Sequence, residues 1–132
     1  MKIITSGKRK RAVARAVLTE GNGKIRINHK DPNHLQIFDR LRIEEPLRIA
    51  KEILGEINFD VEIFIYGGGE KGQIDAARVA LSRALCQGSK SLELKKAFLN
   101  YDRNLLVADV RRKEAYKPGD SKARRKRQKS FR

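Results

Sequence analysis

The sequence predicts a small α/β domain that carries a strongly basic C-terminal tail. Residues 59–66, FDVEIFIY, place an apolar residue at every second position, as a β-strand does. The segment after them repeats apolar residues at helical spacing, whereas residues 111–132 have no apolar period. A chain of 132 residues can build one thin hydrophobic core. We therefore expect a globular domain at 1–110 and an extended tail at 111–132.

Two short apolar segments near the N-terminus indicate a β-hairpin. Residues 12–18 are apolar except for Arg15, and residues 24–28 alternate between polar and apolar side chains. The sequence GNG at 21–23 favours a tight turn between them. We expect the two strands to pair and to leave a basic face beside the cationic cluster at 8–11.

Two helical segments are expected before the strand at 59–66. Leu35, Phe38 and Leu41 recur at helical spacing, which indicates one apolar helix face. Pro46 follows two acids and suits the first position of a second helix, because its missing N–H would have no partner there. A glycine at position 55 is expected to end that helix.

The remaining elements follow from the FDVEIFIY strand onward. Phe64 and Tyr66 make its second face partly apolar, which predicts a central strand covered on both sides. Apolar residues between 74 and 85 form a helical stripe, and its alanines allow close approach to the sheet. A further helix is expected around 92–99, and a last strand at 105–110.

The charge of the chain predicts a polyanionic partner. The chain has 31 Lys and Arg residues against 16 acids, a formal net charge of +15. Residues 111–132 hold 11 of the cations and two acids, a net of +9, which leaves +6 for the other 110 residues. Such an excess repels itself in isolation and attracts nucleic acid.

Other chemistries find little support in the sequence. A single cysteine, Cys86, fits a reducing compartment, and no apolar run reaches the roughly 20 residues that span a bilayer, so we expect a cytoplasmic protein with no membrane partner. His29 and His34 lack neighbours at metal-ligand spacing. Asp60 and Glu62 are expected to be solvated. We predict no metal, no cofactor and no enzymatic activity.

A glycine-rich loop, GGGEKG at 67–72, spells G-x-G-x-x-G before a helix. A dinucleotide site would require a second strand ending in an acid about 20 positions later, but Glu93 lies in an expected helix. A phosphate loop would require Gly-Lys-Ser/Thr, and Gln73 follows the last glycine instead. Two interpretations remain: a turn that needs positive φ, or a loop whose bare backbone lets RNA approach. In the second, the amides of Gly72 and Gln73 would face a phosphate and Lys71 would add charge.

The tail also allows more than one interpretation. It suits a solvated charge run, a localisation signal or an extension that penetrates folded RNA. The second cationic cluster at 8–11 favours RNA, because a disordered basic chain gains order when phosphates replace its counterions. Phe131 offers one plane on which a base could stack.

These segments together resemble the family of the ninth protein of the small ribosomal subunit. The resemblance covers nearly the whole chain and rests on the following segments, in order: GKRKRAVARAVL, GNGKIRIN, EEPL, GGGEKGQIDAARVALSRAL, YDRNLLVADVRRKEAYKPG and KARRKRQKSFR. So many matches in order are specific, unlike the glycine pattern alone.

The resemblance implies a fold and a place in the ribosome. The fold is a two-layer sandwich with a mixed sheet, similar to the second domain of small-subunit protein five, including a left-handed βαβ crossover. The place is the head of the small subunit, on the 3′ major domain of its rRNA, beside small-subunit proteins seven, ten and fourteen.

Family members also extend the tail toward the anticodon stem-loop of the tRNA in the peptidyl (P) site. Carried over by position, the tRNA contacts are Lys129, Ser130, Phe131 and Arg132. The ending Ser-Phe-Arg resembles the archaeal and eukaryotic type, which has tyrosine where this chain has Phe131.

Contacts to rRNA are assigned to the cationic cluster, the glycine-rich loop and the tail. They are Lys8, Arg9, Lys10, Arg11, Gly67, Gly68, Gly69, Lys71, Gly72, Gln73, Arg111, Arg112, Lys117, Lys122, Arg124, Arg125, Lys126 and Arg127. The runner-up function is a free-standing RNA-binding or RNA-chaperone protein, and a small nucleotide-dependent enzyme is a distant third.

Overall fold

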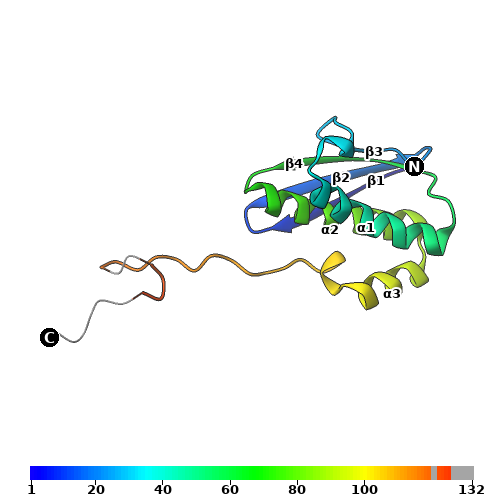
Figure 1. Ribbon diagram of the computed structural model, residues 1–132. Coiled ribbons are helices and arrows are strands. Elements are labelled where there is room, and N and C mark those ends of the chain that lie inside the picture. The colour runs from blue at the N-terminus through cyan, green and yellow to red at the C-terminus, as the bar shows by residue number, and fades with distance from the viewer. Residues whose placement is uncertain (120–121, 126–132) are drawn as a thin grey trace.

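A computed structural model of the chain describes residues 1–119 and 122–125, as a mixed four-stranded sheet with helices on one face (Figure 1). The strand order is β1-β2-β4-β3, with β3 parallel to β4 and the other neighbours antiparallel. The strands are β1 (Lys2–Arg9), β2 (Ala12–Glu20), β3 (Ile25–Ile27) and β4 (Phe59–Tyr66). The helices are α1 (Ile37–Leu54), α2 (Glu70–Ser89) and α3 (Leu92–Tyr101), with short 3₁₀ turns η1 (Pro32–His34) and η2 (Arg103–Leu105). The two-layer α+β fold is confirmed, and the unit β3–α1–β4 is the expected βαβ crossover, whose left-handed sense stays a prediction.

The N-terminal hairpin is not the one that the sequence suggested. β2 pairs with β1, a strand that we did not expect, and β4 lies between β2 and β3. The chain turns from β1 to β2 at Lys10, which has a left-handed φ of 54°. The expected turn at 21–23 instead crosses the end of β4, because the Gly21 amide donates to the Asn58 carbonyl at 3.0 Å. That crossing carries β3 to the far side of β4.

Asp60 holds this crossing in place. One of its carboxylate oxygens accepts three backbone N–H groups, from Asn22, Gly23 and Lys24, at 2.9, 3.1 and 2.9 Å. These bonds lower the pKa of Asp60 below its usual value, and the bond from the Lys24 amide has the largest effect. The expectation of a merely solvated Asp60 is therefore wrong, and the second acid of that strand, Glu62, pairs with His29 at 2.8 Å.

Asp60→Ala is expected to lower the melting temperature, because three backbone amides lose their acceptor. Asp60→Asn keeps an oxygen at this position, so its melting temperature should fall less. A depressed carboxyl pKa stabilises the fold above the unfolded pKa of about 3.9, and this contribution is lost as the pH falls through the folded value. In thermal unfolding, the parent's advantage over Asp60→Asn should therefore shrink as the pH drops below about 4. A constant advantage across this range would contradict the role given to the charge.

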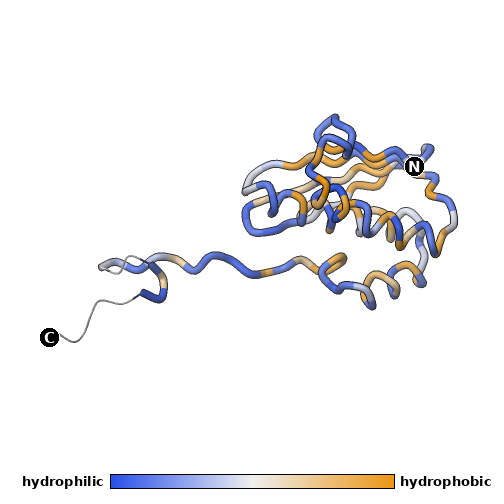
Figure 2. The backbone as a smooth tube through the Cα atoms, viewed as in Figure 1, coloured by the Kyte–Doolittle hydropathy of each residue, from blue (hydrophilic) through white to orange (hydrophobic). Residues whose placement is uncertain are grey.

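Small residues bring α2 close against the sheet. Ala12, Ala14 and Ala16 on β2 are fully buried. A Cβ on Gly7 of β1 would come within 2.3 Å of the Ala76 carbonyl oxygen on α2. The predicted close approach of helix and sheet is confirmed, and Figure 2 shows the apolar stretches on these strands and helices, with a mostly hydrophilic tail.

Three expectations about the other elements are wrong. β4 is an inner strand, but the helices cover one face only and Tyr66 is 61% exposed. Pro46 does not begin a second helix but lies buried inside one continuous helix α1. Gly55 ends that helix as predicted, with φ 80°. Residues 105–110 form no strand, only η2 and a single bridge between Asp109 and Arg9.

The buried face of α1 also differs from the expected stripe. Its buried residues are Asp39, Ile43, Pro46 and Ala50, which recur at helical spacing. Phe38, assigned to an apolar face, is 76% exposed instead. Burial of Asp39, one residue further along, turns Phe38 toward solvent.

Candidate nucleic-acid interface

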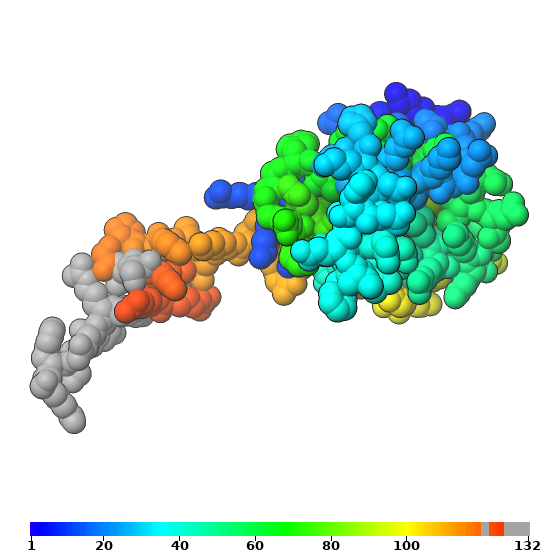
Figure 3. Space-filling view, turned by 45° about the horizontal axis from the view of Figure 1, so that its top comes forward, coloured from blue at the N-terminus to red at the C-terminus, as the bar shows by residue number. Residues whose placement is uncertain are grey.

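One end of the domain brings together three of the segments predicted to bind rRNA. We call it the charged end: the β1–β2 turn at 8–11, the glycine-rich loop and start of α2 at 67–73, and the root of the tail at 109–112. A Cβ on Gly67 would lie 2.7 Å from the Arg11 carbonyl oxygen, so loop and turn touch. In Figure 3, blue side chains of the β1–β2 turn project beside the green loop and the orange tail root.

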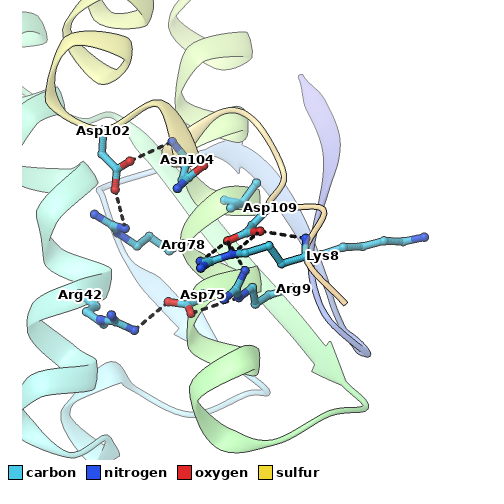
Figure 4. Close-up of a pocket in the computed structure, with 10 residues that line it drawn as sticks. Lys8, Arg9, Arg42, Asp75, Arg78, Asp102, Asn104 and Asp109 are labelled. Carbon is cyan, nitrogen blue, oxygen red and sulfur yellow. Dashed lines mark hydrogen bonds and ion pairs between the residues drawn. The ribbon is translucent and has the colours of Figure 1, made fainter. Parts of the chain in front are cut away.

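A hollow of about 230 Å³ opens at the charged end between the turn, α1, α2 and the segment after α3 (Figure 4). Five cations and three carboxylates line it. Arg42 Nη1 lies 2.8 Å from Asp75 Oδ1, and Arg78 Nη1 lies 3.4 Å from Asp102 Oδ2. Arg78 also pairs with Glu45, yet the cations that line the hollow outnumber its carboxylates, so the lining keeps a net positive charge.

Asp109 fastens the root of the tail to the domain. It pairs with Arg9 of β1, and it accepts the Arg111 backbone amide at 3.0 Å and the Arg111 guanidinium at 2.7 to 3.1 Å. The hydrogen bonds from Arg111 hold the pKa of Asp109 well below its usual range, so it stays charged at neutral pH. Arg83, which no sequence pattern singled out, adds two bonds, to the carbonyls of Leu106 at 3.0 Å and Ser6 at 2.8 Å. The direction in which the tail leaves is thus set by the fold.

The glycines of the loop serve different purposes. Gly67 and Gly68 have φ of 76° and 65°, and a Cβ on Gly68 would lie 2.8 Å from the Ala12 nitrogen. Packing within the chain therefore explains both, as the turn interpretation expected. Gly69, before the first residue of α2, has ordinary φ of −98°, and a Cβ there would meet nothing within 4 Å. Its bare backbone is thus open to a ligand.

The start of α2 offers fewer groups to a phosphate than we expected. The Gln73 amide donates to the Gly69 carbonyl at 2.9 Å inside the helix, and its side chain donates to the Gly67 carbonyl at 3.1 Å. Within α2, the backbone amides that lack a carbonyl acceptor belong to the residues before Gln73, in the first turn of the helix. Lys71 is exposed and pairs with buried Asp39 at 2.8 Å.

Gly68→Ala and Gly69→Ala should separate the two interpretations of the loop. Gly68→Ala is expected to cost more than about 1 kcal/mol of stability, because alanine is strained at positive φ and meets β2. Gly69→Ala should fold as stably as the parent but bind protein-free small-subunit rRNA more weakly. Thermal unfolding measures the change in stability, and filter binding measures the affinity for rRNA. If Gly69→Ala binds as tightly as the parent, the loop is a structural turn alone.

The described part of the tail runs away from the domain as exposed chain (Figure 1). Arg124 pairs with Glu114 at 2.9 Å, and the ammonium group of Lys113 lies 4.7 Å from the centre of the Tyr116 ring. Arg112, Lys117, Lys122 and Arg125 are exposed. The remaining predicted contacts lie outside the described residues: Lys126, Arg127, Lys129, Ser130, Phe131 and Arg132.

Within residues 1–119 and 122–125, no group of three His, Cys, Asp or Glu residues could hold a metal ion. In the same ranges no helix is long and apolar enough to cross a membrane. Burial raises the pKa of the Cys86 thiol to about 11, which makes it a poor nucleophile at neutral pH.

Comparison with known proteins decides the family. Residues 7–132 match the family model described as ribosomal protein S9/S16. The chain belongs to this family. It is 48% identical to the small ribosomal subunit protein uS9 of Methanococcus vannielii, with both chains covered completely. It is 46% identical to the protein of the same name from Methanococcus maripaludis strain C5, again over both whole chains.

Membership of the S9/S16 family confirms the resemblance read from the sequence. The relatives are archaeal, which agrees with the archaeal and eukaryotic type that the Ser-Phe-Arg ending indicated. The family consists of structural ribosomal proteins, so the chain is a ribosomal protein.

Proposed function

We propose that this ribosomal protein builds the head of the small subunit by binding the 3′ major domain of its rRNA, and that its tail reaches the P-site tRNA. The observation that carries the proposal is the charged end, where the cationic β1–β2 turn and the glycine-rich loop meet the root of a tail with net charge +9. A basic surface continuous with a basic extension suits a folded RNA with deep crevices between phosphate strands.

The mechanism is electrostatic positioning and involves no chemical catalysis. The charged end docks on rRNA phosphates, and the tail neutralises strands that would otherwise repel one another. Asp109 and Arg83 fix the direction of the tail root, which lowers the entropy lost when the tail threads into RNA. Such contacts recognise the backbone and not the bases, so the same tip can serve every P-site tRNA.

The tip of the tail is assigned to tRNA by the family resemblance. The Arg132 guanidinium can form a charge-assisted, bidentate contact with a phosphate, and Lys129 adds a second charge. Proteins seven, ten and fourteen of the small subunit are proposed as neighbours, and the cytoplasmic ribosome as the location.

Fractionation of cell extract on a sucrose gradient tests the proposal. The protein should accompany small subunits in a one-to-one ratio, and it should remain with them after a high-salt wash because many contacts must break together. Recovery only at the top of the gradient would contradict the proposal and favour a free-standing RNA-binding protein. Saturable micromolar binding of ATP or NAD in calorimetry would instead revive the nucleotide-dependent enzyme.

A further inference from the structure

A second hollow adjoins the charged end, and an exposed aromatic ring forms one of its walls. It measures about 450 Å³, within the roughly 300–1,000 Å³ typical of small-molecule sites. It shares Arg9, Arg42 and Asp75 with the hollow of Figure 4 and extends from them to Phe38 and Lys71. The hollow therefore continues the surface proposed to face rRNA.

Phe38 is a large apolar side chain that stands in solvent on the side of α1 that lines the hollow. The ring is 76% exposed, in the first turn of α1. Asp39 beside it is only 5% exposed and is tied to Lys71 of α2 at 2.8 Å. This pair joins α1 to α2 and, together with the burial of Asp39, sets the rotation of α1 and the side on which Phe38 stands. Phe38 therefore stands in solvent at the wall of the hollow, where a flat partner can cover its ring.

The charges around the ring favour an anion. Four cations and two carboxylates line the hollow, a net charge of +2. The Lys71 ammonium group uses one of its three donors on Asp39, and Arg42 uses its Nη1 on Asp75 at 2.8 Å. Lys10 is exposed at the tip of the β1–β2 turn. Donors thus remain for a phosphate group beside the aromatic plane.

We propose that this hollow binds one unpaired nucleotide of the rRNA, with its base stacked on Phe38 and its phosphate held by Lys10, Lys71 and Arg42. The inference rests on the proposed function and adds the class of RNA that is recognised. A base inside a duplex cannot reach the ring, whereas an unstacked base presents a flat π-face that pairs with an aromatic side chain. The cationic rim opposes a basic protein segment as occupant.

Tryptophan at position 38 would report the contact directly. The chain contains no tryptophan, so Phe38→Trp introduces a single tryptophan that can still stack and that can be excited apart from the three tyrosines. Leu92→Trp is the matched control, because Leu92 is 73% exposed and begins α3, away from the charged end. Protein-free small-subunit rRNA should quench the fluorescence of Phe38→Trp and leave that of Leu92→Trp largely unchanged.

Binding affinities complete the test. Phe38→Ala and Phe38→Leu should bind this rRNA about 5- to 150-fold more weakly than the parent, while Phe38→Trp and Leu92→Ala keep its affinity. Equal affinity of Phe38→Ala and parent, with salt-dependent rRNA binding intact, would overturn the nucleotide site alone. If the parent itself does not bind this rRNA, the proposed function is overturned. Quenching of Phe38→Trp by small-subunit proteins and not by rRNA would assign the hollow to a protein partner and overturn the proposal.

Discussion

The affinity of the intact chain for protein-free small-subunit rRNA is expected to fall roughly 10³- to 10⁵-fold between about 50 and about 200 mM salt. Each cation that meets a phosphate releases a condensed counterion, and the charged end with the tail offers cations for about six to ten such contacts. Filter binding across the salt series measures the slope of log K against log salt concentration.

Replacement of Arg124, Arg125, Lys126 and Arg127 by glutamine should make this slope shallower by roughly 3 units, because each cation on a phosphate contributes about 0.7 to 0.9 to it. A variant with Arg40, Arg48, Lys51 and Lys95 replaced by glutamine is the matched control, because it removes the same charge from α1 and α3 and should keep the parent's slope. Equal slopes for the parent and the tail variant would show that the tail does not neutralise RNA phosphates.

Deletion of residues 128–132 is expected to weaken P-site tRNA binding by about 10- to 150-fold while small subunits still assemble. The deletion removes Lys129 and Arg132, and a hydrogen bond to a charged group contributes about 1.5–3 kcal/mol. Assembly depends on the charged end and the remaining tail cations, which stay in place. Purified mutant subunits and a tRNA filter-binding assay give the measurement.

Two substitutions refine this expectation. Arg132→Lys keeps the charge and loses the bidentate geometry, so its affinity for tRNA should lie between parent and deletion. Phe131→Tyr keeps the aromatic plane and should bind at least as well as the parent. Unchanged tRNA affinity in subunits that carry the deletion would remove the tip's proposed role. A failure of these subunits to assemble would contradict the expectation that assembly does not need the tip.

The sequence predicted the elements whose signal is local. The strand at 59–66 has an apolar residue at every second position, and the helix after the glycine-rich loop keeps one apolar stripe, so both were found. The first strand was missed because it lies at a sheet edge and alternates only weakly, with Thr5 and Gly7 as the residues that face α2. Its contacts with α2 become visible only when the two elements meet.

Long-range contacts account for the remaining errors. The position of β3 beyond β4 depends on Asp60 accepting the amides of the 22–24 turn, which no pattern within either segment indicates. The buried face of α1 includes Asp39, whose partner Lys71 lies on another helix, so a purely apolar stripe selected the wrong face.

The candidate site was predicted in its parts and not in its arrangement. Charge and composition identified the cationic cluster, the glycine-rich loop and the tail. Their meeting at one end of the domain depends on the pair Arg9–Asp109, which joins the two ends of the globular part. Phe38 and Arg42 were not predicted as site residues, because a phenylalanine and an arginine in a helix are common in any sequence. Only the structure shows that they line one hollow with Lys10 and Lys71.

Acetylation of lysines in intact small subunits, quantified by mass spectrometry against the free protein, tests most directly whether the charged end faces RNA. Lys8, Lys10 and Lys71 are exposed in the free domain, as are Lys90, Lys95 and Lys96 on the part of the domain that the proposal does not assign to RNA. We expect strong protection of the first three in the subunit, and less protection of the second three. Reactivity of Lys8, Lys10 and Lys71 equal to that of the free protein would contradict the proposed orientation.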